Sequence, residues 1–138
     1  MLRRPPEARW CACALIAVVS IAATFTPGAL LGLEWQREAI DQGQWLRLLS
    51  AHVAHLNLRH LLFNLLGLLL ISELLLERWR AADIAVLSVV SALGTSLLLW
   101  CYEPGLQWYA GLSGLLHGWW GGAALAGCRY RHGWLHAG

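Results

Sequence analysis

Four polar side chains interrupt the apolar stretches of this sequence at a repeated spacing. His60 and Asn64 lie four residues apart in one stretch, and Ser113 and His117 lie four residues apart in a later one. Residues with this spacing share one face of a helix. A serine hydroxyl becomes a nucleophile when a base lies beside it, and imidazole and amide groups donate hydrogen bonds. Because strongly polar groups within apolar spans are costly, we interpret all four as functional.

Two other roles for the histidines have to be weighed. His60 and His117 on different helices are also compatible with axial ligation of a haem or a metal ion, or with a hydrogen bond between helices that has no chemical role. A haem or metal site at the two histidines would not explain why Ser113 and Asn64 lie at the same spacing. We therefore expect no cofactor and no metal.

The elements that carry these residues are apolar enough for a bilayer. Hydrophobic residues make up 58% of the chain and charged residues 13%, against about 45–50% and 25% in soluble domains. Four runs approach the roughly 20 residues that a spanning helix needs: 11–33, 58–76, 84–102 and 108–127. The first run resembles a signal peptide in its arginine-rich start, but its length favours a span. We predict an all-α membrane protein with one domain over residues 1–138.

The arginines predict the orientation of the four spans. Seven of the ten lie in the N-terminal tail, the second loop and the C-terminal tail, which share one side of the membrane. The positive-inside rule therefore places both termini in the cytoplasm and the polar loop 34–57 outside. Single arginines at the ends of apolar runs do not form a nucleic-acid patch, so we expect membrane lipids and no nucleic acid as partners.

This topology brings the four polar residues to a similar depth. The spans 58–76 and 108–127 both start at the outer surface. At 1.5 Å per residue, His60 and Asn64 lie about 3 and 9 Å below it, and Ser113 about 8 Å. Glycines at 111, 114, 118, 121 and 122 allow close approach between helices, which an active site or ordinary packing requires.

The pattern around these residues resembles the rhomboid intramembrane serine proteases. Gly111-Leu112-Ser113-Gly114 is similar to the GxSG nucleophile motif of that family. His60-Leu61-Leu62-Phe63-Asn64, preceded by His55, is similar to its second-span HxxxN motif. Trp45-Leu46-Arg47 lies where rhomboids carry a Trp-Arg pair, with one residue intervening. The resemblance covers roughly residues 45 to 127.

The resemblance implies a role for each residue. Ser113 would be the nucleophile, and His60, Asn64 and the Ser113 backbone N–H would hold the oxyanion. Most rhomboids have tyrosine where this chain has His117, which would pack beneath the site. This substitution resembles the bacterial rhombosortases, which implies an inner-membrane enzyme that processes secreted proteins with a GlyGly-type C-terminal sorting helix.

The resemblance also implies a general base that this chain lacks. Rhomboids have six spans and carry a base histidine in the sixth, whereas four are present here. His132 and His136 lie about 20 Å or more from Ser113, across the membrane. His117, one turn away on the same helix, is poorly oriented for proton transfer, and His60 would be lost as a donor. We expect a C-terminally truncated protease; the alternative is a non-catalytic rhomboid-like protein that binds transmembrane helices.

The four cysteines are expected to be reduced and without a functional role. They are Cys11, Cys13, Cys101 and Cys128, and no CxxC pair occurs among them. Within a helix, the spacing of Cys11 and Cys13 turns the two side chains to different faces.

Overall fold

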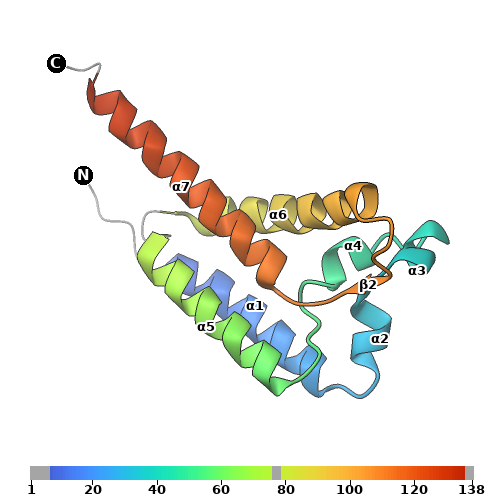
Figure 1. Cartoon of the computed structure of the whole chain (residues 1–138). Helices are drawn as coiled ribbons and strands as arrows, with labels where there is room; N and C mark the ends of the chain where they lie inside the picture. Colours follow the sequence, from blue (N-terminus) through green and yellow to red (C-terminus); the bar gives the residue numbers. More distant parts are fainter. Residues whose placement is uncertain (1–6, 76–78, 136–138) are drawn as a thin grey trace.

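A computed structural model describes the backbone of residues 7–75 and 79–135 and the side chains of residues 10–74 and 79–126. Within these ranges the chain is mostly helical (Figure 1). In chain order the elements are α1 (Glu7–Phe25), α2 (Ala29–Leu33), β1 (Trp35–Gln36), α3 (Arg37–Asp41), α4 (Arg47–Ser50), α5 (Leu58–Leu75), α6 (Ala81–Tyr102), β2 (Trp108–Tyr109) and α7 (Ser113–Leu135).

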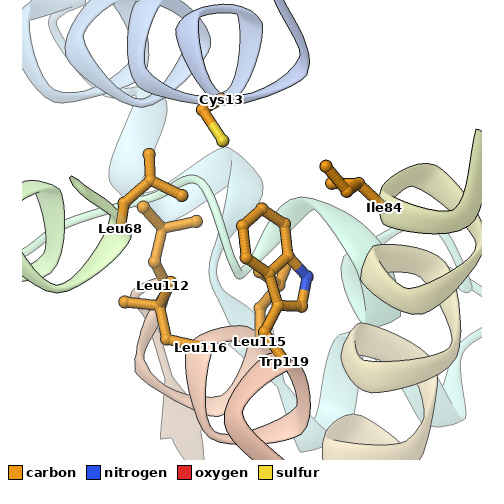
Figure 2. Close-up of a cluster of buried hydrophobic side chains, with 7 residues drawn as sticks. All are labelled: Cys13, Leu68, Ile84, Leu112, Leu115, Leu116 and Trp119. Carbon is orange, nitrogen blue, oxygen red and sulfur yellow. The ribbon is translucent and has the colours of Figure 1, made fainter. Parts of the chain in front are cut away.

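Three long helices, α1, α5 and α6, share a core with α7. Helix α7 contacts both α5 and α6, while α1 lies beside α5 and also contacts α6 (Figure 1). Their shared core consists of Cys13, Leu68, Ile84, Leu112, Leu115, Leu116 and Trp119 (Figure 2). The Trp119 ring is fully buried at the centre, and its Nε1–H donates to Ser88 Oγ at 3.1 Å. The segment that carries Ser113 is thus held on three sides by other helices.

The first predicted run, residues 11–33, is not one continuous helix. Helix α1 ends at Phe25, and a turn at Thr26-Pro27-Gly28 separates it from α2. Gly28 has a φ of 75°, a left-handed conformation that glycine adopts without a steric penalty. The helix ends just before Pro27, because a proline ring disfavours the helical conformation of the preceding residue.

The loop between α1 and α5 folds onto the end of α6. Strand β1 pairs with β2 antiparallel, with Trp35 opposite Tyr109. The guanidinium of Arg37 donates to the carbonyl oxygens of Leu99, Trp100, Glu103 and Leu106 at 2.9–3.1 Å. A cation is favourable at the C-terminus of a helix, where carbonyl groups lack partners. Arg37 therefore fixes this loop to α6.

Three glycines of α7 let it approach α6 closely. A Cβ on Gly114, Gly118 or Gly122 would lie 2.6, 2.1 and 2.9 Å from side-chain atoms of Thr95, Ser91 and Leu87 respectively. These glycines are four residues apart and form one face of the helix. Gly121 lies off this face, and a Cβ there would have no neighbour within 4 Å. The close approach predicted from the glycines therefore takes place against α6.

The outer faces of the helices are strongly apolar. On α5 the exposed side chains include Leu62, Phe63, Leu66, Leu69, Leu70 and Leu74. Within the described residues, one helix, Ala81–Tyr102, is long and apolar enough to cross a membrane, and α1 contains a shorter apolar stretch, Trp10–Phe25. The predicted runs 58–76 and 84–102 coincide closely with α5 and α6.

The cysteines of the described region form no disulfide. Cys11 and Cys101 are exposed, whereas Cys13 is buried with its Sγ 2.9 Å from Ser72 Oγ of α5. The side chain of Cys128 lies outside the described residues.

Candidate functional site

Ser113 is the first residue of α7 and is half-buried. A short segment links it to β2 and makes a sharp turn at Gly111, whose φ is 120°. The Gly111 N–H donates to the Ala51 carbonyl at 2.9 Å, so the turn is held by the loop before α5. Because Ser113 begins the helix, its backbone N–H has no partner within α7.

His60 and Asn64 of α5 pack directly against this turn. A Cβ on Gly111 would lie 2.6 Å from His60 Cε1, 2.7 Å from His60 Nε2 and 3.6 Å from Asn64 Nδ2. The absence of a side chain at Gly111 therefore makes room for the imidazole of His60, while the amide of Asn64 lies at an ordinary contact distance beside it. His60 and Asn64, predicted to lie at a similar depth to Ser113, therefore lie beside the Gly111 turn at the junction of α5 and α7.

The start of α5 orients the imidazole and the amide. Asn57 caps the helix, because its Oδ1 accepts a hydrogen bond from the His60 N–H at 2.9 Å. Asn64 is buried and donates one Nδ2 hydrogen to the His60 carbonyl at 3.0 Å. An amide nitrogen has two hydrogens, so Asn64 keeps a second one to donate.

His117 lies on the exposed side of α7. Its Nδ1 is 2.7 Å from the Ser113 carbonyl oxygen. A carbonyl only accepts, so Nδ1 carries the proton and the Nε2 of a neutral ring bears a lone pair. His117 thus contacts the backbone of Ser113, and its hydrogen bond does not involve the hydroxyl.

Tyr109 is a site residue that the sequence analysis did not identify. Its Oη lies 3.1 Å from Ser113 Oγ, accepts from the Gly114 N–H at 2.9 Å and donates to the Gly111 carbonyl at 2.9 Å. Among the described residues, Tyr109 is the hydrogen-bond partner of the Ser113 hydroxyl, and no imidazole bonds to it. The side chains of His132 and His136 lie outside the described region.

Two buried histidines of the loop support this arrangement. His52 Nε2 is 3.0 Å from the Ala92 carbonyl and 3.2 Å from Ser96 Oγ, and its ring packs 5.6 Å from that of Tyr109. Burial lowers the pKa of His52, although the carbonyls of Ala92 and Gly111 favour the charged form. The neutral imidazole thus joins the loop to α6 behind Tyr109.

His55 lies edge-to-face on His60, with the ring centroids 5.2 Å apart. Burial and the neighbouring His60 lower the pKa of His55 to about 4, while a hydrogen bond with the Val53 carbonyl raises it. Within the described part of the chain, His55 Nε2 and His60 Nδ1 are buried without a hydrogen-bond partner. The crowding of three of the six histidines into residues 52–60 was the sequence signal for this cluster.

The described histidines of the site do not form a metal-binding group. Over the described ranges, no group of three or more His, Cys, Asp or Glu residues is placed to hold a metal ion. His60 and His117 contact opposite ends of one short segment, the Gly111 turn and the Ser113 carbonyl.

The structure thus shows a helical bundle in which a serine bounded by glycines begins a helix. Residues 42–137 match the Rhomboid domain family. The chain belongs to the rhomboid family, whose members are embedded in membranes and are generally intramembrane serine proteases. No curated protein is similar enough to be matched to the chain.

Proposed function

We propose that this protein is an intramembrane serine endopeptidase of the rhomboid type. The observation that carries the proposal is the contact of His60 and Asn64 with Gly111, two residues before Ser113. This contact supports a site in which a serine hydroxyl and hydrogen-bond donors from a second helix face the same substrate carbonyl.

In the proposed reaction, Ser113 Oγ attacks the carbonyl carbon of a substrate peptide bond. The carbonyl oxygen becomes negatively charged and is held by His60 Nε2–H, the second Nδ2 hydrogen of Asn64 and the Ser113 backbone N–H. The donors are fixed before the charge develops, so they need little reorganisation; one such donor contributes about 10²–10³ in rate in other enzymes. The hydroxyl proton passes to a general base, which the hydrogen bonds of the described residues do not identify.

The proposed setting is the bacterial inner membrane, with four spans and both termini in the cytoplasm. Lipid would contact the exposed apolar faces, such as that of α5. The proposed substrates are transmembrane segments of secreted proteins with a GlyGly-type C-terminal sorting helix, as the rhombosortase-like His117 implies.

The test is covalent labelling of the purified protein in detergent with a fluorophosphonate probe. Labelling of the wild-type chain that is lost in Ser113→Ala would support Ser113 as an activated nucleophile. Ser50→Ala, which removes a half-buried hydroxyl on α4 that donates to the Leu33 carbonyl, is the matched control and should label normally. Equal labelling of Ser113→Ala and the wild type would refute the assignment of the nucleophile.

A second candidate function is non-catalytic binding of transmembrane helices. It is favoured by one observation: among the residues whose side chains the structure describes, the Ser113 hydroxyl bonds to a phenol and not to an imidazole. A wild-type chain that does not label, yet retains a GlyGly-type helical peptide in detergent, would support this function. Labelling that depends on Ser113 would exclude it.

A further inference from the structure

The hydrogen bonds around Tyr109 specify the direction of the Ser113 hydroxyl. A phenol has one hydrogen to donate and two lone pairs to accept with. The Tyr109 hydrogen goes to the Gly111 carbonyl, because a carbonyl cannot donate, and one lone pair accepts from the Gly114 N–H. The contact with Ser113 must then have Ser113 Oγ–H as the donor. All three hydrogen-bonding positions of the phenol are occupied by the nucleophile segment.

The ring of Tyr109 is itself held from outside that segment. Its backbone pairs with Trp35 in the two-stranded sheet, and its ring packs on buried His52. A side chain fixed at both its backbone and its ring presents the hydroxyl at a defined point. The Tyr109 hydroxyl contacts Ser113 Oγ, which is the reactive atom of the proposed nucleophile.

We propose that Tyr109 is a further residue of the catalytic site, which holds the Ser113 hydroxyl in its reactive rotamer. This inference rests on the proposed function. Tyr109 takes no proton in this role: it accepts the hydrogen bond of the resting hydroxyl and bonds to Gly111 and Gly114 on either side of it. The O–H bond rotates from Tyr109 toward the general base when the serine attacks, and the Oγ atom keeps its position. The lone pairs of Ser113 Oγ are thereby turned away from Tyr109 in the resting site.

The first test is the rate of fluorophosphonate labelling. A hydrogen bond contributes about 0.5–1.5 kcal/mol, so losing the one that orients Ser113 should slow labelling about two- to tenfold. Tyr109→Phe is expected to show this loss. Tyr102→Phe, which removes the hydroxyl of an exposed tyrosine on α6, should leave the rate unchanged. Equal rates for Tyr109→Phe and the wild type would overturn the proposal.

The second test measures the hydrogen bond itself and is independent of activity. The chain contains three tyrosines, which can be replaced biosynthetically by 3-fluorotyrosine. In ¹⁹F NMR, Ser113→Ala should shift the resonance of residue 109 and leave that of residue 102 in place. The shift reports the hydrogen bond between the two side chains, the labelling rate reports its effect on the nucleophile, and an unmoved resonance would overturn the proposal.

The two tests separate the failure of this inference from the failure of the proposed function. A wild-type chain that does not label refutes the protease proposal and, with it, a catalytic role for Tyr109. A chain that labels normally in the Tyr109→Phe variant refutes the role of Tyr109 alone. Slower labelling together with the ¹⁹F shift supports both.

Discussion

The substitution Gly118→Ala should destabilise the packing of α7 on α6. A Cβ at this position would lie 2.1 Å from Ser91 Oγ, 2.4 Å from Ser91 Cβ and 3.3 Å from Ser91 Cα. The first two distances are far below van der Waals contact, and the third involves backbone, so side-chain rotation alone cannot relieve the overlap. The two helices must separate locally for the methyl group to fit.

The size of the effect follows from two opposing contributions. Overpacking a close contact costs about 1–3 kcal/mol, and replacing glycine by alanine within a helix returns up to about 1 kcal/mol. We therefore expect a net loss of about 1–2 kcal/mol in the free energy of unfolding. For a chain of this length, each kcal/mol lowers the melting temperature by about 3–5 °C.

The assay is thermal unfolding in detergent, followed by tryptophan fluorescence. Gly121→Ala is the matched control, because its Cβ would enter open space and should leave the melting temperature equal or higher. Ser91→Gly should partly rescue Gly118→Ala, since it removes the atoms that the new methyl group meets. Equal stability of Gly118→Ala and Gly121→Ala, or strictly additive effects in the double variant, would refute the proposed packing.

Three further predictions follow from other contacts. Gly111→Ala should abolish fluorophosphonate labelling, because its Cβ would overlap the His60 ring and its φ of 120° disfavours alanine; normal labelling would contradict the proposed site. Arg37→Met should lower the free energy of unfolding by about 2 kcal/mol, because four carbonyl oxygens at the end of α6 lose a charged donor. Arg59→Met, on an exposed position, is its control in the same unfolding assay and should change little. Burial lowers the pKa of His55 to about 4. Between about pH 6.5 and 4 the unfolded state therefore binds a proton that the folded state does not, so the free energy of unfolding should decrease as the pH is lowered through this range. His55→Asn should flatten this dependence in melting temperatures measured across that range; an unchanged slope would show that other groups are responsible.

The sequence predicted those parts of the fold that depend on local composition. The runs 58–76 and 84–102 coincide closely with α5 and α6. A long apolar segment in lipid must satisfy its own backbone hydrogen bonds, and a helix does so within the segment. The run 11–33 is divided because Pro27 and Gly28 disfavour a continuous helix. The run 108–127 begins as a strand, and α7 starts five residues later. That strand is stabilised by its pairing with β1, which is distant in the chain, and the local composition of residues 108–127 does not reveal such a pairing.

The candidate site could also be predicted only in part, because some of its residues depend on local spacing and others on tertiary contacts. The similar depth of Ser113, His60 and Asn64 stays a prediction from helix rise and topology, and the structure places His60 and Asn64 beside Gly111, two residues before Ser113. Tyr109 could not, because its contact with Ser113 depends on the positive φ of Gly111 and on the sheet pairing. His117 was expected beneath the site, and the structure places it on the exposed side of α7, bonded to the Ser113 carbonyl.

The pairing of Trp35 with Tyr109 has a consequence for the biosynthesis of this protein. Its two strands are separated in the chain by α3, α4, α5 and α6, so the sheet cannot form until the ribosome has completed all four helices. Tyr109 and the turn at Gly111 depend on that sheet, and they position the serine that follows them. The earlier helices must therefore be in place before the hydroxyl of Ser113 is oriented, and a half-made chain in the translocon would carry no assembled nucleophile.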